Sequence, residues 1–356
     1  MSYSNKKVAL NPKISMPTKR LNDLIKLANI QASSDNEKMM YHYVCSWLED
    51  RNIPYETDAI GNILATKGKS DMYPMIASHL DTVHEIHKEF KVMSSKGKDG
   101  NLMLSAFSGA KQVGVGGDDK CGIFTNLYML EKIDNIKAVF FTQEEVGLIG
   151  SGNADVDWFN DVGYIIQLDR WGSSDFISRY GGESTISDEF ADSINDVMDE
   201  YGFKHTEGLI TDSIGLWSDG IGISCVNVSC GYYQHHTDDE VIDTNELWNS
   251  VMFTYYCIKS LGENEYVSSP KIFTSSEPSF HNMDFDYTKY TDEWSTDKDT
   301  YLYDVIDWQT LDYEALLSIM GTNNLTELMR VRTNEEMALD IINEYRLITN
   351  TELCFA

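Results

Sequence analysis

Five short stretches of this chain place acids or histidines directly after apolar or glycine-rich segments. They are His79-Leu-Asp81, Gly117-Asp118-Asp119, Gln143-Glu144-Glu145, Leu168-Asp169 and His235-His236. Carboxylates crowded at one site repel each other and raise their own pKa values unless cations neutralise them. Imidazoles together with several carboxylate oxygens suit zinc, with cobalt or manganese as alternatives. The set therefore predicts a site for two divalent metal ions, beside which a carboxylate that binds no metal can act as a general base.

The glycine-rich stretch Gly114 to Gly122, which contains Asp118 and Asp119, has two interpretations. Its glycines allow a tight turn and a close approach to other groups. An acid pair at the start of an apolar helical run, here Ile123 to Ile133, is typical of a helix N-cap. In the company of the other four stretches, Asp118 is instead a candidate metal ligand.

The elements that must position these residues are apolar runs that end in them. Met75 to Ser78 runs into His79, 137–142 into Gln143, 163–168 into Asp169, and 221–230 leads towards His235. Helical patterns alternate with these runs, at 18–28, 39–48, 121–133, 187–201 and 245–261. The order predicts an α/β fold with a mostly parallel central sheet and helices on both faces. Ligands in such folds bind outside the carboxyl ends of the strands.

Two further segments read as hairpins, and the ends of the chain differ from its middle. Residues 58–65 predict an edge hairpin, and 86–113 a hairpin excursion that returns to the Gly114 loop. We expect a disordered or loosely packed N-terminus at 1–17 and one domain at 18–268. The remainder, 269–356, is predicted to be an acidic extension with about two helices, at 311–319 and 334–347.

The composition excludes some classes of partner. The chain has 356 residues, 42% of them hydrophobic, and a formal net charge of −29. Such a charge repels nucleic-acid phosphates and anionic membranes, so neither is an expected partner. The six cysteines are scattered and mostly apolar in context, and the N-terminal residues lack the apolar core of a signal peptide. These features predict a cytoplasmic protein.

Taken in order, the motifs resemble those of the co-catalytic di-zinc exopeptidases, the clan of peptidase T, the carboxypeptidase G-like enzymes and the single-domain zinc aminopeptidases. The resemblance covers roughly residues 18–262. It is carried by these segments: His79-Leu-Asp81-Thr-Val, Gly117-Asp118-Asp119-Lys-Cys-Gly122, Thr142-Gln-Glu144-Glu145-Val-Gly, Leu168-Asp169 and His236-Thr-Asp-Asp-Glu240. It implies the three-layer zinc exopeptidase/phosphorylase-like fold. The short segment between Asp169 and His236 predicts that no lid domain is inserted there.

The resemblance also implies a role for each motif residue. Asp118 would bridge two metal ions, which the resemblance implies to be zinc, and would form a cis peptide with Asp119. His79 and Asp169 would complete one metal site, and Glu145 and His236 the other. Asp81 would orient His79 from behind, and Glu144 would be the general base and later the acid.

Several residues near these motifs keep two interpretations. The family signature fits either His235 or His236 and favours His236, which leaves His235 as a pocket or surface residue. Arg170, Arg179, Tyr232 and Tyr233 are candidates to hold a peptide terminus, although Arg170 can equally form a structural ion pair with Asp169. His84 and His87 lack the spacing of a helical zinc site, and we expect them in a solvated loop.

The resemblance leads to a metal-dependent exopeptidase that cleaves short peptides, most simply an aminopeptidase. A homo-oligomer is compatible with it. The same machinery could hydrolyse an N-acyl amino acid. A different class of function is a binding or structural relative without catalysis, in which the acidic C-terminal extension would engage a partner. A complete ligand set together with Glu144 favours the enzyme, because a protein without catalysis has no physical need for a base.

Overall fold

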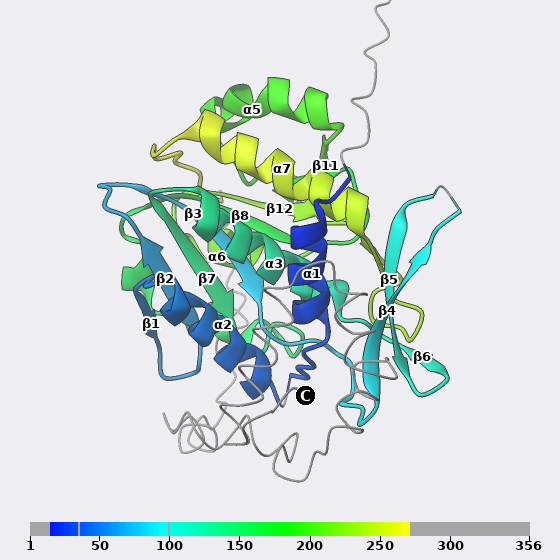
Figure 1. Ribbon diagram of the computed structural model, residues 1–356. Coiled ribbons are helices and arrows are strands. Elements are labelled where there is room, and N and C mark those ends of the chain that lie inside the picture. The colour runs from blue at the N-terminus through cyan, green and yellow to red at the C-terminus, as the bar shows by residue number, and fades with distance from the viewer. Residues whose placement is uncertain (1–14, 35, 99, 271–356) are drawn as a thin grey trace, which may run out of the picture. The chain divides into compact units, whose positions relative to one another are not determined.

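The fold rests on a nine-stranded sheet, seen in a computed structural model that describes residues 15–34, 36–98 and 100–270 (Figure 1). The strand order is β1-β2-β7-β3-β8-β12-β9-β10, with β11 paired to β9. The predicted helices at 311–319 and 334–347, and most of the predicted N-terminal segment, lie outside the described residues. The strands of this sheet are β1 (Tyr55–Thr57), β2 (Ile63–Lys67), β3 (Tyr73–His79), β7 (Ile136–Phe141), β8 (Val162–Arg170), β9 (Asp175–Tyr180), β10 (Glu183–Ser184), β11 (Lys204–Glu207) and β12 (Ser224–Ser229).

Strands β7, β3, β8 and β12 are neighbours in the centre of the sheet, and each pairs in parallel with the next. Strands β1 and β2 form an antiparallel hairpin at one edge, so the hairpin predicted around residues 58–65 is confirmed. The mostly parallel sheet is likewise confirmed. Its four central strands are nearly wholly buried because both of their faces are covered.

Helices cover both faces of the sheet and give the three layers. Along β3, Ile76 joins one apolar core and its neighbours Met75 and Ala77 join the other, since side chains of a strand alternate between faces. The first core includes buried side chains of α1 (Thr18–Ala28), α2 (Lys38–Asp50), α3 (Gly117–Lys132), α5 (Asp188–Tyr201) and α7 (Thr244–Leu261). The second includes those of the 3-10 helix η1 (Val156–Phe159) and of α6 (Asp212–Ser218), against which the short α4 (Ile149–Gly152) packs. Helices α5 and α7 lie side by side (Figure 1).

A second, five-stranded sheet lies beside the first and has the order β13-β14-β5-β4, with β6 paired to β5. Its strands are β4 (Phe90–Lys96), β5 (Leu102–Ser108), β6 (Lys111–Val113), β13 (Tyr232–Tyr233) and β14 (Val241–Asp243). The hairpin excursion predicted at 86–113 is therefore confirmed. Its pairing with β14 was not predicted, and it ties the segment that leads to Gly114 to the strands on either side of His236.

The segment between Asp169 and His236 contributes β9, β10, β11 and β12 to the main sheet, and its helices α5 and α6 pack on the two faces. This agrees with the prediction that no lid domain is inserted. Helix α3 begins at Gly117 rather than at Cys121 as predicted, and Asp118 and Asp119 interrupt its helical backbone. Among the described residues, no helix is both long and apolar enough to cross a membrane.

Candidate metal centre

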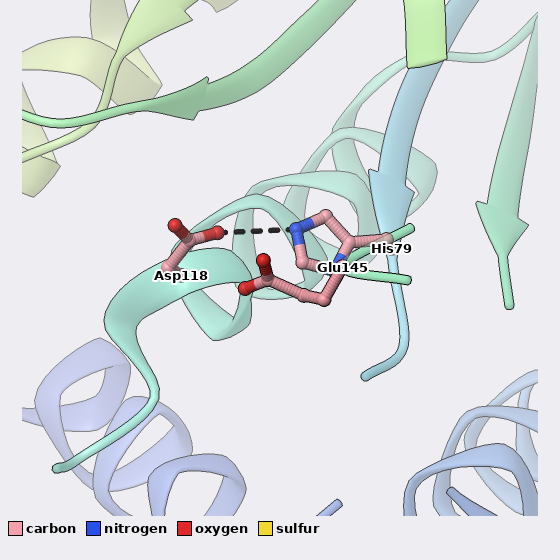
Figure 2. Close-up of side chains that lie close together, drawn as sticks. All are labelled: His79, Asp118 and Glu145. Carbon is pink, nitrogen blue, oxygen red and sulfur yellow. Dashed lines mark hydrogen bonds and ion pairs between the residues drawn. The ribbon is translucent and has the colours of Figure 1, made fainter. Parts of the chain in front are cut away.

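The carboxyl ends of the central strands bring the predicted acids and histidines together. His79 is the last residue of β3, Asp169 lies near the end of β8, and Glu144 and Glu145 follow β7. Asp118 reaches the same place from the start of α3. Figure 2 shows His79, Asp118 and Glu145 facing one another. The His79 Nε2 atom lies 3.1 Å from Asp118 Oδ1 and 3.6 Å from Asp169 Oδ1.

A second cluster shares the Asp118 carboxylate. The His236 Nε2 atom lies 3.4 Å from Asp118 Oδ2 and 3.1 Å from the Glu145 carboxylate. Asp118 thus directs one oxygen to His79 and the other to His236. The backbone of His236 is left-handed, with φ of 59°, which places its ring here while the ring of His235 stacks beside Trp171. Of the two adjacent histidines, the geometry brings only His236 to the acids.

The donor set fits a divalent cation better than it fits hydrogen bonds alone. Asp81 Oδ1 lies 3.2 Å from His79 Nδ1, and a carboxylate can only accept, so Nδ1 carries the proton. With a proton on Nε2 as well, the ring can donate to the oxygens of Asp118 and Asp169. When that proton is displaced, Nε2 presents a lone pair beside these oxygens, which is the donor arrangement that a divalent cation needs. Two groups have ligand atoms mutually within 4.8 Å, His79-Asp118-Glu145 and His79-Asp119-Asp169.

Asp119 has a different environment from Asp118. Its Oδ1 accepts a hydrogen bond from the N–H of Gly122 at 2.8 Å, and its Oδ2 accepts one from the N–H of His79 at 3.2 Å. It therefore caps the regular part of α3, as one interpretation of the acid pair predicted. The peptide between Asp118 and Asp119 is cis, as the resemblance implied. We favour Asp118 over Asp119 as the carboxylate available to a metal, because both Asp119 oxygens are engaged by backbone N–H groups.

Asp81 is fully buried and holds two parts of the cluster at once. Besides contacting the His79 ring, it accepts hydrogen bonds from the backbone N–H of Glu144 at 3.0 Å and of Glu145 at 3.2 Å. Burial alone would raise the pKa of Asp81, but the hydrogen bond and charge of His79 lower it below its ordinary value. One carboxylate thus orients the His79 ring and fixes the turn that carries both glutamates.

The electrostatics of the cluster are those of a crowded acid site. Burial raises the pKa of Glu144 and of Asp169 well above their ordinary values, and neighbouring carboxylates add to both shifts. For His79, burial favours the neutral ring, but hydrogen bonds with Asp118, Asp169 and Asp81 raise its pKa well above the ordinary value. Hydrogen bonds with Asp118 and Glu145 raise the pKa of His236 to about 10. Without a cation, the site retains protons that a metal ion would displace.

The candidate substrate residues differ in whether they lie beside the acid cluster or are engaged elsewhere. Arg170 forms an ion pair with Asp175 at 3.2 Å, rather than with Asp169, and the hydroxyl of Tyr233 donates to Glu246. Tyr232, in contrast, is buried with its hydroxyl 3.5 Å from Asp169 Oδ1. The ring centroid of His235 lies 5.0 Å from that of His236. Of these candidates, Tyr232 contacts an acid of the cluster, and His235 lies beside the ring of His236; Arg179, on β9, donates to the carbonyl of Gly182.

Three buried polar groups behind the site were missed by the sequence reasoning. Glu37 accepts hydrogen bonds from the Thr142 hydroxyl and the Gln143 N–H, just before Glu144. Gln167 donates to Asp169 Oδ2 at 3.2 Å and to Asp212 at 3.3 Å. Alternation along β8 places Gln167 and Asp169 on one face, which was the available signal for Gln167. Glu37 and Asp212 come from remote segments, and no local pattern marks them.

His84 is also not where the sequence predicted it. Its side chain is only 15% exposed, and its Nε2 lies 2.7 Å from the fully buried carboxylate of Glu240. The expectation of a solvated loop is wrong for this residue, because the pairing of the loops places an acid from a distant segment beside it. Glu240 was visible in the His236-Thr-Asp-Asp-Glu240 motif, but the motif did not reveal its partner.

The metal-free protein should lose stability as the pH rises from 5 to 9. Burial raises the pKa of Asp212 from 3.8 to about 7, and carboxylates raise that of His236 from 6.5 to about 10. Each of these two groups binds more protons in the folded than in the unfolded state, so each lowers stability as pH rises through its window. Burial lowers the pKa of Lys120 to about 8, and this opposite effect offsets part of the loss above pH 8. The lowered pKa of Asp118 does not change the pH dependence in this range, because this carboxylate is ionised in both the folded and the unfolded state above pH 5. Thermal unfolding of chelator-treated protein at pH 5, 7 and 9 measures the effect.

Two controls belong to this pH prediction. The variant Asp212→Asn should make the decrease between pH 5 and 7 shallower, with the remainder due to Glu144 and Asp169, and should leave the decrease between pH 7 and 9. Metal-loaded protein should show a growing advantage in Tm over metal-free protein as pH rises, because metal ions bind deprotonated ligands. A metal-free Tm that rises from pH 5 to 9 would contradict the electrostatic description.

No protein-family model matches the sequence, and no curated protein matches it significantly. Solved structures do resemble the fold. The aminopeptidase PepT from Bacillus cereus aligns with a TM-score of 0.56 at 14% identity, over 69% of this chain and 99% of its own. A tripeptidase from Staphylococcus aureus aligns with a TM-score of 0.54 at 15% identity, over 70% of this chain and 99% of its own. A TET aminopeptidase from a marine-sediment thaumarchaeote aligns with a TM-score of 0.53 at 12% identity, over 68% of this chain and 97% of its own. The chain thus shares the α/β fold of these two aminopeptidases and the tripeptidase, which is the fold that its motifs predicted.

Proposed function

We propose that this protein is a metal-dependent exopeptidase that cleaves short peptides from the amino end. The observation that carries the proposal is the position of the Asp118 carboxylate. One of its oxygens lies 3.1 Å from His79 Nε2 and the other 3.4 Å from His236 Nε2. A carboxylate shared in this way between two histidines, each with a further acid beside it, is suited to bridge two metal ions.

In this proposal, His79, Asp118 and Asp169 would hold one ion, and Asp118, Glu145 and His236 would hold the other. Imidazole and carboxylate donors suit zinc best, with cobalt or manganese as alternatives. The high density of buried acids supports this assignment, because the charge of two divalent ions would offset their mutual repulsion. When bound, such a pair supplies a Lewis acid for the scissile carbonyl and lowers the pKa of water.

The protein groups would carry the proton and hold the geometry. Glu144 would accept a proton from the attacking water and later deliver it to the leaving amine. The raised pKa of Glu144 brings it towards the range that suits a general base. Asp81 would fix the backbone of Glu144 and Glu145 through two hydrogen bonds and orient the His79 ring. Tyr232 would limit the movement of Asp169 through its hydroxyl.

The charge of the site supports a substrate with a free amino terminus. An ammonium group is attracted by the surrounding carboxylates, whereas a free carboxylate needs a cationic partner. Arg170, one candidate for that partner, is engaged by Asp175 through both its Nε and Nη2 atoms. At the rim, His235 and the 43% exposed Trp171 form a stacked pair that could contact a substrate side chain. These features favour an aminopeptidase over an N-acyl amino acid hydrolase.

A tripeptide with a free amine should be hydrolysed at least tenfold faster, in kcat/KM, than the same peptide acetylated at its amine. Tenfold corresponds to about 1.4 kcal/mol of lost transition-state interaction, which is modest for one charged contact. Amine release can be followed for Leu-Gly-Gly and its N-acetyl form, with chelator-treated enzyme as the blank. Preferential cleavage of N-acetyl-leucine would instead support the deacylase. Hydrolysis of none of these substrates by protein loaded with zinc, cobalt or manganese would oppose the proposal.

The described cysteines are consistent with the proposed cytoplasmic location. Cys45, Cys121, Cys225, Cys230 and Cys257 are buried, and none of them forms a disulfide with another described cysteine. Thiols persist in reducing compartments, whereas secreted proteins tend to oxidise theirs to disulfides.

A further inference from the structure

Behind the Asp118 carboxylate lies a buried glutamate with three hydrogen-bond donors. The carboxylate of Glu240 is fully buried. Its Oε2 accepts from the N–H of Gly116 at 2.6 Å, and its Oε1 from the N–H of Asp118 at 3.2 Å. The Nε2 atom of His84 lies 2.7 Å from Oε2, and this nitrogen must donate because a carboxylate only accepts. These donors stabilise a charge whose burial would otherwise be costly.

The His84–Glu240 pair joins three loops, and each loop contains or directly adjoins a proposed metal ligand. His84 lies in the loop that follows His79 at the end of β3. Gly116 belongs to the loop that leads into Asp118. Glu240 lies four residues after His236, in the loop between β13 and β14. A single buried contact therefore connects the backbones that carry His79, Asp118 and His236.

The glycine-rich loop is shaped around this pair. A Cβ atom on Gly114 would lie 1.9 Å from Cε1 of the His84 ring, so only glycine allows the ring to sit there. Gly116 has φ of 68°, in the left-handed region, and this conformation directs its N–H to Glu240. The glycines, from which the sequence predicted a tight turn and a close approach to other groups, are thus fitted to one imidazole and one carboxylate.

We propose that His84 and Glu240 are positioning residues that hold the Asp118 carboxylate between the two metal sites. The inference rests on the proposed function. Glu240 fixes the Asp118 backbone at its N–H, and His84 holds Glu240 in register with the end of β3. Neither side chain is assigned a bond to a metal. Their effect is on the spacing between His79, Asp118 and His236, which determines how tightly two ions are held together.

Substitution of Glu240 by glutamine should weaken metal binding. Glutamine has one acceptor oxygen, so its NH₂ group would face an N–H donor of the loop or of His84. The affinity for zinc should fall by ~10–100-fold, as for the loss of other outer-shell partners. At limiting zinc kcat should fall, with KM for a peptide changed less than threefold. Competition with a chromophoric chelator measures the affinity, and the Tm of metal-free protein monitors the fold.

Variants of His84 test the pair without removing the buried acid. His84→Gln retains an N–H donor of similar reach and should keep zinc affinity within a few-fold of the wild type. His84→Ala removes the donor and should reproduce the loss seen with Glu240→Gln. Asp238→Asn is the matched control: it removes one negative charge from the same loop, but at an exposed ion pair with Lys111, and should leave zinc affinity unchanged.

The outcomes separate this inference from the proposed function. If wild-type protein binds no zinc, cobalt or manganese, both are overturned. If wild-type protein binds two ions and His84→Ala and Glu240→Gln bind them equally tightly, only the positioning role is overturned. A lower metal-free Tm with unchanged zinc affinity would assign the pair a purely structural role and would also overturn it. If Glu240→Gln does not fold, the comparison of His84→Gln with His84→Ala decides.

Discussion

Replacement of Glu144 by glutamine should lower kcat for peptide hydrolysis by about 10²–10⁴-fold, the range typical of a lost general acid–base. Glutamine has nearly the same shape but cannot take up a proton from water. The backbone of residue 144 should stay in place, because Asp81 holds it through the main-chain N–H. Steady-state kinetics on a free-amine tripeptide, together with elemental analysis of the same preparation, measures both consequences. The metal content should equal that of the wild type.

The neighbouring substitution Glu145→Gln is the control for this experiment. Glu145 lies 3.1 Å from His236 Nε2 and is proposed as a metal ligand, so its neutralisation should reduce the metal content as well as the rate. Glu144→Gln should lose activity but keep its metal, whereas Glu145→Gln should lose both. This difference would distinguish the general base from the metal ligand. Full hydrolysis by Glu144→Gln would show that another group moves the proton. Absence of hydrolysis in the wild type, with metal bound, would favour a binding or structural protein.

Replacement of Asp118 by asparagine should remove most of the bound metal and with it the activity. Wild-type protein purified without chelator is expected to contain about two zinc, cobalt or manganese ions per chain, as in other bridged two-metal sites. An amide is neutral and binds such ions weakly, and both proposed sites share this one carboxylate. The loss of zinc affinity should therefore exceed the ~10–100-fold expected for an outer-shell residue. Elemental analysis and chelator competition provide the measurement.

The same substitution one residue later should have a different effect. Asp119 accepts hydrogen bonds from the buried N–H groups of His79 and Gly122, and an asparagine can satisfy only one of them. The metal content of Asp119→Asn should stay near that of the wild type, while the free energy of unfolding falls by about 1–3 kcal/mol. That loss lowers Tm by roughly 2–4 °C per kcal/mol in a domain of this size. If Asp119→Asn lost its metal and Asp118→Asn kept it, the bridging role would belong to Asp119.

The strand ends were predictable because they depend on local chemistry. An apolar run of strand length that stops at His79, Glu144 or Asp169 marks both a buried strand and a polar terminus. Parallel strands have their carboxyl ends at one edge of a sheet, so three separate runs predict one site without any knowledge of contacts. Hydrophobic periodicity predicted the helices in the same way, except at Asp118 and Asp119, where backbone geometry shifted the start of α3.

Other features depend on the meeting of distant segments. The sequence could not show that Glu240 reaches the N–H groups of Gly116 and Asp118, because these contacts join loops more than a hundred residues apart. Nor could it show that His84 packs over Gly114, because that contact depends on how two loops meet. The partners of Arg170 and Tyr233 lie only 5 and 13 residues away in the sequence, but they too were hidden, since a polar residue carries no local sign of the acid that it will meet.

The sequence by itself determined the residue types of the site, their order, the sheet edge at which they gather and the class of ion that they suit. Tertiary structure decided how the tasks are divided: which of two adjacent aspartates caps a helix and which faces two histidines, and that His236, which the motif favoured over His235, lies against the acids. The physical reason is that donor chemistry belongs to the side chain. The partner that satisfies each buried donor or acceptor, in contrast, is set by the packing of the whole fold.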